Sequence, residues 1–151
     1  MFNTKMAAEF VVNKVLSWSS NEDTFELPSG NYWIGDLCYV LNEELYDEIV
    51  LGGRDGVFKV SKDNAVPEFI AFAGTYAGDG NYLVKVNRKK SGVVSVDAGI
   101  IGIVHTSLVE HEEKQLGFNY SSENPIKVQM YDGIFRFTSG KDTIIINTRD
   151  Y

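Results

Sequence analysis

The stretch IKVQMYDGIFRFT, residues 126–138, decides the fold class of this chain. Apolar and polar residues alternate on both sides of Asp132-Gly133, a period of two that is typical of strands with one buried face. Asp-Gly accepts the positive φ values of a tight two-residue hairpin turn. The stretch therefore predicts an antiparallel β-hairpin that turns at Asp132-Gly133.

The same alternation recurs along most of the chain after Gly53. It marks the runs 57–61, 69–76, 82–87, 93–96, 100–106, 126–131, 134–138 and 143–148. We therefore predict an α+β fold that is mostly antiparallel β. The expected form is a strongly bent sheet or partly open barrel of about eight to ten short strands with one or two short helices.

The clearest helix signal begins at Asn42, whose side chain can cap free backbone N–H groups. Leu41, Leu45 and Ile49 then form one apolar stripe that ends at Gly52-Gly53. These features predict a helix over residues 42–51.

Three other segments are harder to interpret. Ala7, Val11, Val15 and Trp18 fall on one helical stripe, so we predict a helix in the first twenty residues, although the same residues also suit a strand. The Glu- and Lys-rich residues 107–116 suggest a second short helix. Residues 117–125 are expected to form an irregular loop.

Length and charge limit the classes of function. The 151 residues fit one domain, 1–151, and the net charge of −7 makes nucleic acid an unlikely partner. No apolar run approaches the roughly 20 residues of a membrane helix. With the single Cys38 and no signal-peptide pattern, the expected location is the cytoplasm, which is the host cytoplasm if a phage encodes the chain.

A short Asp-Gly sequence pattern recurs at three places. Asp55-Gly56, Asp79-Gly80 and Asp132-Gly133 each precede a strand-like run with an aromatic residue two positions after the glycine. Each run is followed by a basic turn, at 61–63, 88–92 and 139–142. Irregular spacing favours a recurring hairpin design over a true repeat.

Three aspartates lie beside glycines in apolar surroundings: Asp36, Asp79 and Asp97. If their loops converge, the carboxylates can hold Mg²⁺ or Ca²⁺ or act as an acid and base pair. The alternative is structural, because aspartate also caps backbone N–H groups in turns.

Aromatic residues accompany the same glycine-rich segments, namely Tyr32, Trp33, Tyr39, Tyr76 and Tyr82. Aromatic walls with a few polar groups are typical of a small-ligand pocket. We therefore predict that these five and the three aspartates bind a ligand, with core packing of about half the aromatics as the competing interpretation.

Nucleophilic and zinc chemistry have little support. Cys38 with His105 or His111 as base would give a thiolate site, yet a lone cysteine in an apolar run is usually a small buried residue. One cysteine and two histidines make a tetrahedral zinc site improbable. No catalytic residue, metal ligand or cofactor is therefore assigned.

Three segments together resemble small proteins of bacteriophages and bacteria. They are SGNYWIGDLCY (29–39), YAGDGNY (76–82) and VDAGIIG (96–102), which match a Gly-Asp-x-Cys-Tyr, an Asp-Gly-x-Tyr and a Val-Asp-x-Gly-x-Ile-Gly pattern. The pattern often has proline before the cysteine, where this chain has Leu37. The resemblance implies a phage or prophage origin and no particular activity.

The expected function is a non-catalytic binding protein of phage or prophage type. It would bind a host protein or sequester a small nucleotide-like signal, either of which would fit a counter-defence role. Two alternatives stay open: a small metal-assisted hydrolase that uses the clustered aspartates, and a virion or assembly component. The sequence does not give the oligomeric state.

Overall fold

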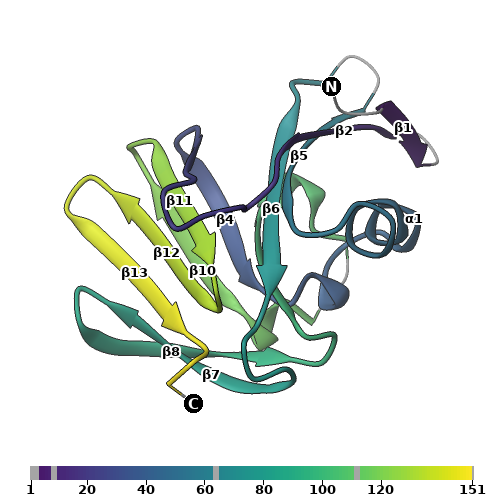
Figure 1. Cartoon of the computed structure of the whole chain (residues 1–151). Helices are drawn as coiled ribbons and strands as arrows, with labels where there is room; N and C mark the ends of the chain where they lie inside the picture. The colour runs from purple at the N-terminus through teal and green to yellow at the C-terminus, as the bar shows by residue number, and fades with distance from the viewer. Residues whose placement is uncertain (1–3, 8–9, 63–64, 111–112, 151) are drawn as a thin grey trace.

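Two antiparallel sheets form the protein (Figure 1), in a computed structural model that describes residues 4–7, 10–62, 65–110 and 113–150. The first sheet has the order β1 (Thr4–Ala7), β2 (Phe10–Leu16), β5 (Gly56–Lys62), β6 (Glu68–Gly74), β9 (Ile100–His105), β4 (Gly30–Gly35), β10 (Phe118–Ser122). The second has the order β3 (Phe25–Leu27), β11 (Ile126–Tyr131), β12 (Ile134–Ser139), β13 (Asp142–Asn147), β7 (Gly80–Val86), β8 (Lys89–Val96).

The main core lies between the two sheets. Strand β12 shows how the alternation builds it, because Phe135 and Phe137 point inward and are buried while Arg136 between them is exposed. Tyr82 of β7 joins the same core, as do Tyr32 and Ile103 of the first sheet. The opposite face of the second sheet carries outward side chains of both kinds, polar and apolar, among them Lys85, Arg136 and Leu83.

A second core covers the other face of the first sheet. Short helices pack there: η1 (Leu37–Tyr39), α1 (Glu43–Tyr46), the π-helical turn η2 (Asp47–Leu51) and η3 (Thr106–Leu108). Figure 1 shows α1 on the side of the first sheet that faces away from the second. Because both faces of this sheet are covered, β9 reads Ile-Ile-Gly-Ile-Val, with five consecutive buried residues.

The predicted fold class is confirmed, since the chain is mostly antiparallel β with short helices. The hairpin turn at Asp132-Gly133 is present, and both residues have positive φ, +55° and +80°. The helix at 42–51 is also present as α1 and η2, and the Asn42 side chain accepts a hydrogen bond from the backbone N–H of Leu45 at 3.1 Å.

Some local predictions were wrong. The first twenty residues hold strands β1 and β2 in place of a helix, because β2 pairs with β5 and buries Phe10 and Val12 on one face. Residues 118–122 form β10, which pairs with β4, where we expected an irregular loop. The segment 107–116 holds the 3₁₀ turns η3 and η4 (Glu113–Leu116), with 111–112 outside the described residues.

The strands also do not form one bent sheet. They divide into two open sheets of seven and six strands. None of the helices in the described ranges is long and apolar enough to cross a membrane.

Candidate ligand-binding groove

Asp36 is the centre of the aspartate cluster, and its carboxylate is completely buried. Oδ1 accepts a hydrogen bond from the backbone N–H of Cys38 at 3.1 Å. Oδ2 accepts two more, from the N–H groups of Asp97 at 2.8 Å and Ala98 at 2.6 Å. Asp36 thus joins the end of β4 to the turn between β8 and β9, which is the structural alternative considered for it.

The loops of Asp79 and Asp97 do come together with that of Asp36. The backbone N–H of Thr75 donates to the carbonyl of Gly99 at 2.9 Å, and the Thr75 hydroxyl donates to the carbonyl of Gly78 at 2.6 Å. Both side chains, Asp79 and Asp97, are exposed. Within the described residues, no group of three or more histidine, cysteine, aspartate or glutamate side chains is placed to hold a metal ion.

Tyr32 and Tyr82 hold their own turns inside the main core. Each hydroxyl donates to a carbonyl four residues earlier, at 2.7 Å: Tyr32 to Pro28 and Tyr82 to Gly78. Burial, and to a smaller extent the charge of Glu68, raises the pKa of Tyr32 to about 12. Both tyrosines are 2% exposed, so they offer almost no surface to a ligand.

The other predicted aromatics lie in different places. Trp33 follows Tyr32 in β4, so it points to the opposite face of the sheet and is fully buried in the second core. Tyr39 is half-buried against that core. Tyr76 is 60% exposed, in the loop between β6 and β7. The five aromatics therefore do not share one pocket wall.

His105 makes a local turn contact. Its Nδ1 accepts from the backbone N–H of Ser107 at 3.1 Å and lies 2.9 Å from the Ser107 hydroxyl. The Glu68 carboxylate approaches the same Nδ1 at 3.7 Å. A catalytic triad needs the hydroxyl and the carboxylate on different ring nitrogens, so this cluster lacks that geometry. Cys38 is half-buried, and His111 lies outside the described residues.

A groove with a volume of about 1210 Å³ lies on the outer face of the second sheet. Its floor is formed by outward residues of β7, β12 and β13, and its rim by two turns and by Asp150 near the C-terminus. We call it the basic groove; the side chains used below are Lys85, Arg88, Arg136, Lys141 and Ile145. None of these five was predicted as a site residue; of the predicted residues, Tyr82 also belongs to the lining.

Four cationic side chains line the basic groove against one carboxylate, in a chain whose net charge is −7. Arg136 pairs with Ile145, and Ile145 pairs with Lys85, so the three form one row across the sheet. Arg136 and Lys85 are thus two strand spacings apart, about 10 Å. Within the described part of the chain, no carboxylate lies in ion-pair distance of the four cations.

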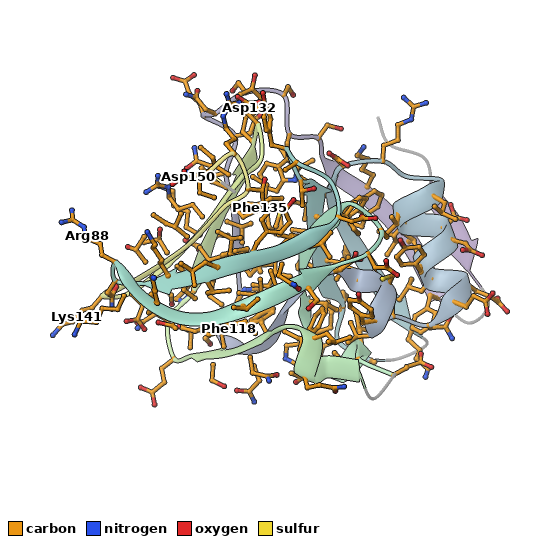
Figure 2. The ribbon with its side chains drawn as sticks, turned by 90° about the horizontal axis from the view of Figure 1, so that it is seen from below. Arg88, Phe118, Asp132, Phe135, Lys141 and Asp150 are labelled. Atoms are coloured by element: carbon orange, nitrogen blue, oxygen red, sulfur yellow. The ribbon has the colours of Figure 1, made fainter. Side chains whose placement is uncertain are left out.

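Asn87 fixes the end of the groove by joining two hairpin turns. Its backbone N–H donates to the carbonyl of Thr143, and its side-chain oxygen accepts from the Thr143 N–H, both at 2.9 Å. Its Nδ2 also donates to Asp142 at 3.0 Å. As Figure 2 shows, Arg88 and Lys141 are thereby held next to each other at one end of the molecule.

One sequence signal could have indicated this site, and one feature of the strand pairing agrees with it. The recurring Asp-Gly pattern has three basic turns, and the second and third of them, 88–92 and 139–142, meet at the basic groove. In addition, Lys85 lies directly opposite Lys90 in the pairing of β7 with β8. Like charges in that arrangement destabilise a sheet, so the pair maintains positive charge at a cost in stability.

Comparison with known proteins gives no further assignment: no protein-family model, curated protein or solved structure matches the chain.

Proposed function

We propose that this protein is a non-catalytic binding protein whose basic groove takes up a small phosphate-bearing ligand, such as a nucleotide. The observation that carries the proposal is the set of four cationic side chains around one concave floor, without carboxylate partners among the described residues. Arginine and lysine are the side chains that bind phosphate groups most strongly.

The floor of the groove suits the remainder of such a ligand. Ile145 lies between Arg136 and Lys85, and the half-exposed Leu83 of β7 lies beside Val93 of β8. An apolar floor between cations fits a molecule with anionic groups and a flat apolar body, because both parts then find complementary surface. Asn81 and Asn147 add amide groups at the far end.

The biological setting of the proposal comes from the resemblance to phage proteins. A binding protein that acts in the host cytoplasm and removes a nucleotide-like signal would serve as counter-defence against the host. The support for this setting is the sequence pattern of residues 29–102 together with the basic groove.

The test is a binding titration with ATP, pyrophosphate and uncharged adenosine, followed by calorimetry at low and high salt. We expect ATP and pyrophosphate to bind and adenosine not to bind, with affinity falling as salt rises. Lys85→Ala and Arg136→Ala should each weaken ATP binding by about tenfold, which corresponds to loss of one charge-assisted hydrogen bond.

Lys127→Ala is the matched control, because Lys127 is exposed on β11 of the same sheet and does not line the groove. It removes the same charge and should leave binding within about twofold. Equal losses in all three variants, or equal binding of adenosine and ATP, would contradict a phosphate site in the groove.

A further inference from the structure

A smaller hollow of about 380 Å³ lies between the two sheets at a different place, where the loop after β6 meets the turn between β11 and β12. Its lining includes three aromatic side chains, Trp18, Tyr76 and Tyr131, and two carboxylates, Asp55 and Asp132. No cationic side chain is part of the lining. We call it the acidic aromatic pocket.

Hydrogen bonds from several elements fix the walls of this pocket. The Trp18 indole N–H donates to the carbonyl of Phe72 at 3.1 Å, and Asp55 Oδ2 accepts from the backbone N–H of Gly74 at 2.9 Å. The buried Thr148 hydroxyl accepts from the Tyr76 N–H at 2.9 Å and donates to the Gly133 carbonyl. The side chains of Trp18 and Asp55 and the backbone of Tyr76 are therefore held in place before any ligand arrives.

A contact within the protein shows that one edge of the pocket accommodates a guanidinium group. The guanidinium of Arg149 lies 4.3 Å from the centre of the Tyr76 ring, and its Nη1 lies 2.6 Å from Asp132 Oδ2. A guanidinium stacked on an aromatic face and paired with a carboxylate is a favourable arrangement for arginine. The Asp55 carboxylate and the rings of Trp18 and Tyr131 are outside this contact, so the rest of the pocket can receive a second cation.

Two of these aromatic side chains are also exposed to a degree that is uncommon for large apolar groups. Tyr76 is 60% and Tyr131 42% exposed. Tyrosine, tryptophan and arginine are the residue types that contribute most to binding energy at protein interfaces. A pocket with exposed tyrosines and the Asp55 carboxylate, which Arg149 does not contact, is therefore complementary to a protruding arginine.

We propose that the acidic aromatic pocket binds an arginine side chain presented by a partner protein. The guanidinium would stack on Tyr131 and pair with Asp55, in the way that Arg149 stacks on Tyr76 and pairs with Asp132. This site is separate from the basic groove and does not depend on the function proposed for that groove.

The two tryptophans make the test direct. Trp18 lines the pocket, whereas Trp33 is fully buried in the second core, so their indole N–H signals in an NMR spectrum serve as probe and internal reference. The ligand is the peptide acetyl-Gly-Arg-Gly-amide, and the control ligand is the same peptide with uncharged citrulline. We expect a saturable shift of the Trp18 signal alone, with the arginine peptide alone.

Variants then assign the contacts. Asp55→Asn removes the negative charge but keeps an oxygen that can accept from the Gly74 N–H. Tyr131→Ala removes one aromatic ring of the pocket. Each variant should weaken peptide binding by about threefold. Arg149→Ala should strengthen binding, because it frees Tyr76 and Asp132. Glu123→Gln, at an exposed position away from the pocket, removes one negative charge as Asp55→Asn does and should change nothing.

Three results would overturn the proposal. The first is an equal Trp18 shift with the citrulline peptide, and the second is the absence of a saturable shift at millimolar arginine peptide. The third is an effect of Glu123→Gln as large as that of Asp55→Asn, since both effects would then come from the overall charge of the protein and not from the pocket.

Discussion

Replacement of Asp36 by asparagine should destabilise the protein by about 3 kcal/mol. In the wild type the carboxylate has no exposure and accepts three backbone hydrogen bonds, from Cys38, Asp97 and Ala98. Asparagine offers one oxygen, which can serve Asp97 and Ala98 together. Its NH₂ group then faces the N–H of Cys38, where two donors meet.

The magnitude follows from those contacts. One charge-assisted hydrogen bond, worth about 1.5–3 kcal/mol, is lost, and two others become neutral and weaker by a further 1 kcal/mol or so in total. For a chain of this length a loss of about 3 kcal/mol lowers the melting temperature by roughly 6–12 °C. This is a large fraction of the usual 5–15 kcal/mol of domain stability.

The assay is urea unfolding followed by tryptophan fluorescence, with the melting temperature as a second measure. Asp79→Asn is the control, because Asp79 is exposed in the neighbouring loop, and it should change stability by less than about 0.5 kcal/mol. A stability of Asp36→Asn equal to that of the control would refute the reasoning. Asp36 would then not be the anchor of the turn, and its carboxylate would be a candidate for function again.

Two further predictions concern the buried side chains of Tyr32 and Trp33. In the wild type, burial raises the pKa of folded Tyr32 to about 12, so above pH 10 the unfolded chain loses this proton first. The stability of the wild type should therefore fall by about 2 kcal/mol between pH 10 and 12. Tyr32→Phe should abolish this part of the alkaline destabilisation. Urea unfolding at several pH values checks this, and an unchanged pH slope in the variant would exclude Tyr32 as the source. Gly117→Ala should cost about 2–3 kcal/mol, because a Cβ there would clash with the fully buried Trp33 ring. Gly74→Ala is the control and should cost far less, because the nearest atom to its Cβ would be 3.7 Å away. Equal thermal stability of the two variants would contradict the packing.

The candidate site was less predictable from the sequence than the fold. Alternation in β7 and β12 marks Lys85 and Arg136 as outward residues, which is a local property. Their meeting depends on β13, which pairs with β12 on one side and with β7 on the other, about 60 residues earlier in the chain. Alternation gives the face of a residue in its own strand and carries no information on the neighbouring strand.

The aromatic cluster illustrates the same limit. Tyr32 and Trp33 are adjacent in sequence, and the prediction places both in one ligand site because they accompany the same glycine-rich segment. In a strand, adjacent side chains point to opposite faces, and here each face of β4 is buried in a different core. To predict that Tyr32 and Trp33 lie in different cores, one must know that residues 31–35 form a strand and that this strand is covered on both faces.

Preferences within a few residues are enough to specify several local elements of this protein. The hairpin turn at Asp132-Gly133, the Asn42 cap and the strand alternation depend on backbone and side-chain preferences within a few residues. Long-range contacts are needed to make residues 10–16 a strand, to bring Asp36 to the amides of Asp97 and Ala98, and to bring two distant basic turns together at one groove. Those features depend on which segments are neighbours, and that choice is set by the joint burial of two cores over the whole chain.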